Sequence, residues 1–148
     1  MAKYLFIAEK PSLMQEVASC YRKHKQEIVQ KVGEIDFVSL VGHLCGNCKP
    51  DEYEEWKGQQ WDEITYPMIP KVWKLKGSDD AGKKKKLKAI KSNYQNYDGI
   101  IVGTDSDIEG YGIYYNLEQY LHIKGKKTLR FMEHSLTDTE ILKSLLTM

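Results

Sequence analysis

The chain has 148 residues, of which 41% are hydrophobic and 29% are charged, and its formal net charge is +1. These values suit one folded domain over residues 1–148 and argue against a disordered chain or a uniformly basic nucleic-acid coat. No apolar run approaches the roughly 20 residues that span a bilayer, and the first residues do not resemble a signal peptide. We therefore expect a cytoplasmic protein without a membrane segment, whose 3 cysteines form no structural disulfide.

The first part of the chain predicts a strand, a helix and a hairpin. Lys3–Ala8 is an almost continuous apolar run, typical of a strand buried on both faces. A proline then opens a helix over Ser12–His24. We interpret Glu27–Val32 and Ile35–Val41 as two further strands joined by a tight turn.

The middle of the chain, Gly42–Gly77, contains all 3 tryptophans but no sustained period. We interpret it as an irregular excursion between the second and third strand regions, and its length suggests a functional role. The following segments alternate between helix and strand: helix Gly82–Asn93, strand Asp98–Gly103, helix Gly110–Leu121, strand Lys127–Met132 and a helix from Thr137 to Leu146. This alternation predicts an α/β fold with a mostly parallel sheet.

Three carboxylates crowd one short turn. Asp105, Asp107 and Glu109 lie in Thr104–Gly110 (TDSDIEG), directly after the predicted strand that ends at Gly103. Ligands bind beyond the carboxyl ends of strands in an open α/β sheet, and Mg²⁺ is commonly held by carboxylates together with phosphate oxygens and water. Acidic residues are also common at helix N-termini. The turn alone leaves a metal site and an ordinary helix start as alternatives.

A second acidic position follows the first predicted strand. Glu9 and Lys10 lie in Ala8–Ser12 (AEKPS), so we expect Glu9 at the same sheet edge as Asp105. A carboxyl group close to other carboxylates can retain a proton and act as a general acid. The Lys10 ammonium can bind a phosphate as a point charge. The alternative is a plain helix start capped by a serine.

Together, these two motifs resemble the Toprim domain of type IA DNA topoisomerases, especially the topoisomerase III branch. Three further segments agree with that family in order and spacing, so the resemblance covers nearly the whole chain. They are the glycine–histidine turn Val41–Leu44, the proline–tryptophan segment Pro67–Leu75, and the closing strand and helix Arg130–Leu145. The resemblance implies a Toprim-like, four-stranded, mostly parallel sheet flanked by helices, with a site for Mg²⁺ (or Mn²⁺) at one edge.

The resemblance also implies roles for the residues at matching positions. Glu9 matches the general acid that protonates the departing 3′ oxygen when a tyrosine attacks DNA, and Lys10 matches a lysine that stabilises the scissile phosphate. Asp105 and Asp107 match the metal-binding aspartates, with Glu109 as a supporting ligand. The metal would orient the phosphate and stabilise charge.

His43 and Arg130 are expected to contact the nucleic acid. The acidic turn departs from the family pattern at two positions, because Ser106 replaces a proline and Ile108 replaces an arginine. Tyr111 stands where an acidic or amide residue is common. Losing the arginine removes a cation, which affects the expected handling of DNA more than metal binding.

The family's nucleophilic tyrosine lies in another domain, so this chain alone is not expected to relax DNA. We expect Tyr111, Tyr114 and Tyr115 to pack against the core from the helix that follows the acidic turn. The sequence is compatible with a piece of a longer enzyme and with a free-standing gene product.

Two other features are weaker. The sequence from His43 to Cys48 (HLCGNC) supplies only three candidate zinc ligands, and a turn after a strand is the better interpretation. Trp56 and Trp61 could stack on single-stranded bases or pack the excursion onto the core. For Trp73 we expect the packing role.

The leading hypothesis is a Toprim domain that supplies the acidic half of a DNA cleavage and rejoining site. Its expected partners are DNA, in single-stranded form, and the remaining topoisomerase domains. Two alternatives stay open. One is a small Toprim nuclease that uses the same acids to cleave with water, and the other is a non-catalytic nucleic-acid-binding module.

Overall fold

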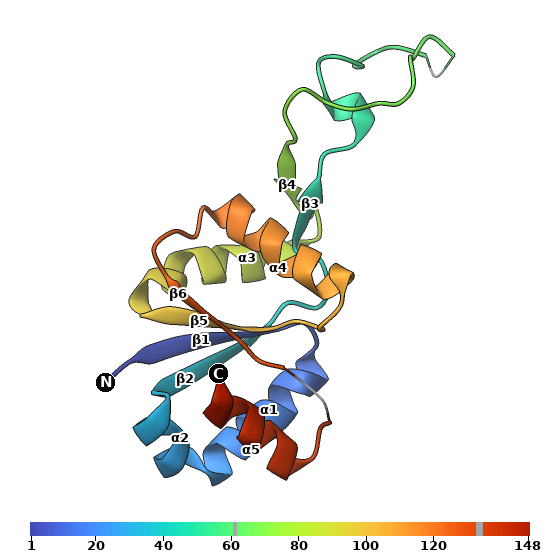
Figure 1. Ribbon diagram of the computed structural model, residues 1–148. Helices are drawn as coiled ribbons and strands as arrows, with labels where there is room; N and C mark the ends of the chain where they lie inside the picture. The colour runs from blue at the N-terminus through green and yellow to red at the C-terminus, as the bar shows by residue number, and fades with distance from the viewer. Residues whose placement is uncertain (61, 133–134) are drawn as a thin grey trace.

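A four-stranded sheet forms the centre of the protein (Figure 1). The computed structural model describes residues 1–60, 62–132 and 135–148. The strands are β2 (Glu34–Ser39), β1 (Lys3–Ala8), β5 (Gly99–Gly103) and β6 (Lys127–Arg130), in this spatial order. Each neighbouring pair is parallel, which confirms the predicted sheet.

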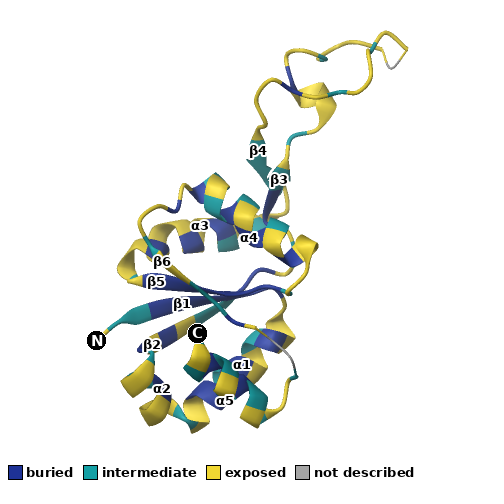
Figure 2. Ribbon diagram, in the orientation of Figure 1, coloured by how far each residue is buried: buried dark blue, intermediate teal, exposed yellow. Residues whose placement is uncertain are grey.

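Helices cover both faces of the sheet because both faces of its central strands are apolar. Along β1, Leu5 and Ile7 belong to one core cluster, whereas Tyr4, Phe6 and Ala8 belong to the other. The first cluster is completed by α3 (Ala81–Asn93) and α4 (Ile108–Leu121), and the second by α1 (Pro11–Lys23), α2 (Lys25–Lys31) and α5 (Asp138–Thr147). Figure 2 shows the resulting pattern, with buried central strands between helices that are exposed on their outer sides. Within the described residues, no helix is long and apolar enough to cross a membrane.

The excursion between β2 and β5 forms an arm that projects from the body (Figure 1). Its base is an antiparallel pair of short strands, β3 (Cys45–Asn47) and β4 (Leu75–Gly77). Short 3-10 helices lie at Pro50–Glu52 in the arm and at Tyr94–Asn96 after α3. The predicted excursion is therefore present, but its base is a regular ribbon.

The predicted hairpin is wrong. Its first half is helix α2, where Ile28 is fully buried and the backbone N–H of Val32 donates to the Ile28 carbonyl at 2.8 Å. The β-branched residues in this segment suggested a strand, but they lie at helical spacing and cover one side of the sheet. Gly33 then adopts a φ of 131°, and β2 runs parallel to β1 instead of returning against a neighbouring strand.

Side-chain caps define the starts of α4 and α5, and Asp80 caps α3 in the same way. Asp107 caps α4, which begins at Ile108, two residues before the predicted position. Thr137 caps α5 by accepting a hydrogen bond from the backbone N–H of Glu140 at 3.4 Å, as the sequence predicted.

Candidate metal and nucleic-acid site

The candidate site lies at the switch point of the sheet, where successive connections between strands run to opposite sides. From β1 the chain passes to β2 on one side, and from β5 it passes to β6 on the other side. The carboxyl ends of β1 and β5 are therefore adjacent, and the helices that follow them leave toward opposite faces. Such a position opens a crevice for ligands in parallel α/β sheets. Glu9 follows β1 and Asp105 follows β5 at this crevice.

Glu9 and Asp105 are joined directly. The Glu9 carboxylate accepts a hydrogen bond from the backbone N–H of Asp105 at 3.1 Å, although Glu9 is only 9% exposed. Lys10 lies over both carboxylates, with its ammonium nitrogen 2.7 Å from Asp105 Oδ2 and 3.8 Å from Glu9 Oε1. The structure thus brings both predicted acids and the predicted lysine to one edge.

A cavity of about 380 Å³ opens beside this group. It is lined by Lys10, Asp105 and Ser106 together with residues at the start of α1 and before α5. Ser106 also lies near Met132, whose sulfur is 3.8 Å from the Ser106 hydroxyl oxygen. Ile108, which stands where the family pattern has arginine, is 92% exposed and forms no part of the core.

The turn between β5 and α4 is shaped by Asp107 and Gly110. Asp107 Oδ1 accepts a hydrogen bond from the backbone N–H of Gly110 at 2.7 Å. A Cβ atom at Gly110 would lie 2.1 Å from the Asp105 carbonyl oxygen, so only glycine allows α4 to start this close to Asp105. Glu109 points to solvent, and its carboxylate is 3.7 Å from His43 Nε2.

The glycine–histidine turn lies against Glu9. The Glu9 carbonyl accepts hydrogen bonds from the backbone N–H groups of Val41 and Gly42, at 3.0 and 3.5 Å. Val41 has a φ of 61°, a strained conformation for a β-branched residue, and Gly42 has a φ of 74°. This backbone path places His43 beside the acidic edge of the sheet. We use this name for the group formed by Glu9, Lys10, Asp105, Asp107 and Glu109.

Arg130 holds the acidic turn from the neighbouring strand β6. Its guanidinium donates to the hydroxyl and carbonyl oxygens of Thr104 at 2.9 and 2.8 Å, and to the carbonyl oxygen of Asp105 at 2.7 Å. It also lies over the ring of Tyr111, 4.6 Å from the centroid. These contacts give Arg130 a positioning role that the sequence did not predict, and its role as a nucleic-acid ligand stays a prediction.

A family model of the Toprim domain matches residues 4–134. The chain belongs to the Toprim domain family. Curated relatives include DNA topoisomerase 3 of Haemophilus influenzae, which is 31% identical over 137 residues, or 90% of this chain and 21% of the relative. DNA topoisomerase 3 of Pasteurella multocida is 36% identical over 109 residues, or 72% of this chain and 16% of the relative. The chain therefore spans about a fifth of the length of these relatives, or less.

The donor groups at the acidic edge fit a hard divalent cation. Asp105, Asp107 and Glu109 offer carboxylate oxygens, the ligand type that Mg²⁺ prefers, and Asp107 uses only one carboxylate oxygen for its cap. The Lys10 ammonium lies 2.7 Å from Asp105 Oδ2, so a metal ion bound by this carboxylate would have to displace it. In the described part of the chain, the oxygen atoms of these three carboxylates do not all lie within 4.8 Å of one another, so binding one ion with all three would require side chains to rotate.

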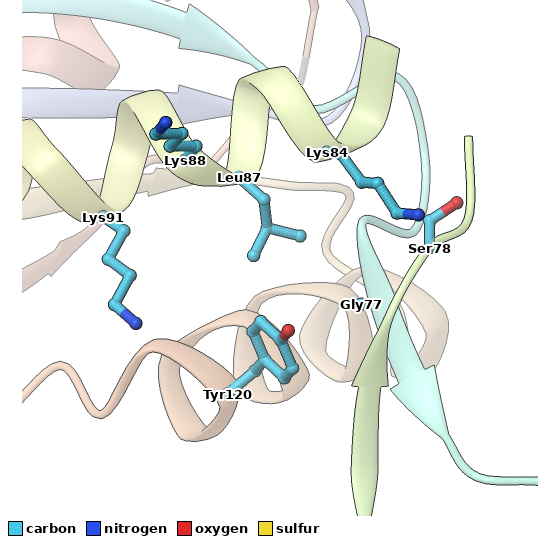
Figure 3. A pocket seen from close by; sticks show the side chains of 7 residues that line it. All are labelled: Gly77, Ser78, Lys84, Leu87, Lys88, Lys91 and Tyr120. Carbon is cyan, nitrogen blue, oxygen red and sulfur yellow. The ribbon is translucent and has the colours of Figure 1, made fainter. Parts of the chain in front are cut away.

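A basic helix borders the same edge. The ammonium of Lys83, at the start of α3, donates to the His43 carbonyl at 3.0 Å, and that of Lys86 donates to the Ser39 carbonyl at 2.7 Å. Farther along α3, a groove of about 270 Å³ separates the helix from α4 and β4. Figure 3 shows Leu87 facing Tyr120 across this groove. Three lysines line it: Lys84, Lys88 and Lys91.

Several aromatic side chains differ from expectation. Tyr114 packs in the core as predicted, but Tyr111 and Tyr115 are each 59% exposed because they lie on the outer side of α4. Burial raises the pKa of Tyr114 to about 12, and the same burial keeps its phenol out of reach of a DNA phosphate.

The tryptophans of the arm also need revision. Trp73 is 62% exposed, so the predicted packing role is wrong, because the arm extends away from the core. Trp56 packs edge-on against Tyr53, with 5.6 Å between ring centroids. Trp61 lies outside the described residues.

The predicted zinc candidates are separated, but another group was missed. Among the described residues, His43, Cys45 and Cys48 do not form a group of gathered ligand atoms, whereas Cys20, His24 and Asp138 do. The signal in the sequence was the spacing of four between Cys20 and His24 within the predicted helix Ser12–His24. The third residue comes from the other end of the chain, so spacing alone could not identify it.

Proposed function

We propose that this Toprim domain supplies the Mg²⁺-binding, acidic half of a type IA DNA topoisomerase site. The observation that supports this proposal most is the contact of Glu9, Lys10 and Asp105 through a hydrogen bond and two ion pairs at the switch point of the sheet. The similarity to curated proteins named DNA topoisomerase 3 supports the reaction class. The nucleophilic tyrosine would come from other domains.

Each residue has a defined task in this proposal. Glu9 delivers a proton to the departing 3′ oxygen and recovers it during rejoining, because its carboxylate is fixed by the Asp105 N–H at the crevice. Lys10 releases Asp105 and binds the scissile phosphate as a point charge. Asp105 and Asp107 would hold a Mg²⁺ ion, with Glu109 as a supporting ligand, and the ion would supply positive charge that stabilises the phosphate. Arg130 keeps the turn that carries these acids in place.

The nucleic-acid path would run from this edge along α3. His43 lies beside Glu109, and Lys83 binds the His43 carbonyl, so the acidic edge continues into the basic helix. Lysines on one side of a helix contact phosphates without reading sequence, which suits an enzyme acting on single-stranded DNA. The exposed ammonium groups of Lys88 and Lys91 extend this path into the groove of Figure 3.

The test is the Mg²⁺ dependence of binding to a single-stranded oligonucleotide, followed by fluorescence anisotropy. Wild type should bind more tightly with Mg²⁺, because the ion would neutralise the carboxylates and attract the phosphate. Asp105→Asn with Asp107→Asn should remove this dependence and the heat of Mg²⁺ binding. The matched control is Asp51→Asn with Asp62→Asn, which removes two exposed carboxylates of the arm and should behave as wild type.

The two alternatives predict different results in the same experiment. Metal-dependent cleavage of the oligonucleotide by the wild-type chain, lost in the Asp105/Asp107 variant, would identify a Toprim nuclease. Binding that ignores Mg²⁺ in wild type and variant alike would overturn the proposed metal site. It would favour a non-catalytic nucleic-acid-binding module.

A further inference from the structure

A second group of metal ligands lies between the first and last helices. Cys20 lies in the last turn of α1, His24 follows its last residue, and Asp138 is the first residue of α5. One ligand atom from each lies within 4.8 Å of the others. The His24 Nε2 to Asp138 Oδ2 distance is 2.9 Å, and the Cys20 thiol donates to the Asp138 carbonyl oxygen at 3.5 Å.

We infer that Cys20, His24 and Asp138 form a zinc site that clamps α5 onto α1. Sulfur, imidazole nitrogen and carboxylate oxygen are the three ligand types that bind zinc in proteins, and thiolate disfavours Mg²⁺. Ligand atoms around a tetrahedral zinc with bonds of about 2.0–2.3 Å lie roughly 3–4 Å apart. Small side-chain rotations therefore bring these three atoms to coordinating positions. Water would occupy the fourth position.

The surroundings of the group allow an ion to enter and be held. Cys20 is 1% exposed and anchors the inner side, whereas the side chains of His24 and Asp138 are 33% and 43% exposed and open to solvent. The helices α1 and α5 pack side by side on the same face of the sheet (Figure 1). Binding requires the Cys20 thiol to release its proton to solvent and His24 to keep its ring proton on Nδ1.

Lys23 competes with the proposed ion. Its ammonium lies 3.0 Å from Asp138 Oδ1, and its side chain is 60% exposed, so it can rotate into solvent when a metal binds. The interaction as it stands is a charged hydrogen-bond network between two helices. The zinc site differs from that network by one testable property, because removing Lys23 should weaken the network but strengthen zinc binding.

This site is separate from the acidic edge. Lys10 is the residue just before α1. Cys20 lies ten positions after Lys10, which corresponds to roughly 15 Å along a helix. The donor sets also differ, since the acidic edge offers oxygen ligands alone. The zinc proposal therefore does not depend on the proposed topoisomerase function.

The experiment is Co²⁺ and Zn²⁺ titration of the reduced chain in the presence of excess Mg²⁺, which occupies oxygen-only sites. Wild type should take up one Co²⁺ with a thiolate charge-transfer band, which Zn²⁺ removes. Cys20→Ser should abolish the band and weaken Zn²⁺ at least roughly tenfold, since even outer-shell changes cost this much. Cys45→Ser, which removes another buried thiol, should leave both unchanged.

Two further variants keep the test decisive if Cys20→Ser folds poorly. Lys23→Ala should bind Zn²⁺ as tightly as wild type or more tightly, and Asp138→Asn should bind it more weakly. Zn²⁺ should raise the thermal unfolding temperature of wild type and Lys23→Ala, because it binds only the folded state. Absence of a thiolate band in wild type, or a band that persists in Cys20→Ser or disappears in Cys45→Ser, would overturn the site.

Discussion

The carboxylate of Glu9 accepts a hydrogen bond from the backbone N–H of Asp105 across 96 positions of sequence. The two residues follow neighbouring parallel strands, so the register of β1 and β5 sets this distance. The bond fixes the Glu9 carboxylate and the start of the acidic turn in one step. It also determines what substitutions at Glu9 should do.

Glu9→Gln should keep the fold, whereas Glu9→Ala should not be neutral. The glutamine carbonyl can still accept from the Asp105 N–H, but alanine leaves this partly buried donor without a protein partner. An unsatisfied buried group costs about 1–3 kcal/mol. Urea unfolding should therefore place Glu9→Ala below Glu9→Gln in free energy of unfolding. Equal stability of the two variants would show that this hydrogen bond does not constrain the turn.

Asp107 should tolerate asparagine better than alanine in the metal-free protein. Its carboxylate caps α4 through the Gly110 N–H, and asparagine caps equally well, whereas alanine cannot accept this bond. Asp107→Ala should lose about 1 kcal/mol of stability relative to Asp107→Asn. Thermal unfolding with EDTA present measures this difference. If Asn and Ala variants unfold together, the cap contributes nothing to stability.

The basic face of α3 should set the salt dependence of DNA binding. Lys88→Glu with Lys91→Glu should weaken single-stranded DNA binding and reduce its dependence on log salt by about 0.7 for each lost phosphate contact. The matched control is Lys25→Glu with Lys31→Glu on α2, which makes the same charge change on the opposite face of the sheet. A similar loss in both double variants would indicate a general charge effect and not a path along α3.

The domain should lose stability at alkaline pH. Burial raises the pKa of the Cys45 thiol from 9.0 to about 11, so the folded state keeps a proton that the unfolded state releases. This contribution is fully present below pH 9.0, disappears as the pH rises through about 11, and is at most about 3 kcal/mol for such a shift. Cys45→Ser should flatten the decline in free energy of unfolding over this range. Cys48→Ser, outside the core, is the matched control, and an unchanged slope in Cys45→Ser would contradict the prediction.

The purified chain should neither relax supercoiled plasmid nor form a covalent DNA adduct. Of the described tyrosines near the acidic turn, Tyr114 is buried in the core and the Tyr111 ring is covered by the Arg130 guanidinium. Plasmid topology on agarose gels and denaturing gels of labelled DNA check the two outcomes. A protein–DNA band that survives denaturation would place a nucleophile within this chain.

The sequence by itself determined the buried strands, the cap of α5 and the positions of the acidic motifs. These features are local, because an apolar run, a capping residue or an acidic turn depends on neighbours a few positions away. The rule that parallel strands present their carboxyl ends at one edge was enough to predict from sequence that Glu9 and Asp105 lie close together. The same local patterns failed for α2, where β-branched residues suited either a strand or a short helix until packing decided.

The tertiary structure decided which groups meet across the chain. Arg130 donates hydrogen bonds to the acidic turn because β6 is the neighbour of β5. Lys10 lies over Asp105 because α1 starts beside the end of β5. Asp138 reaches Cys20 because α1 and α5 share one face of the sheet, although 118 positions separate them. Strand order and helix placement fix these contacts through burial of two cores, and no local sequence pattern encodes them.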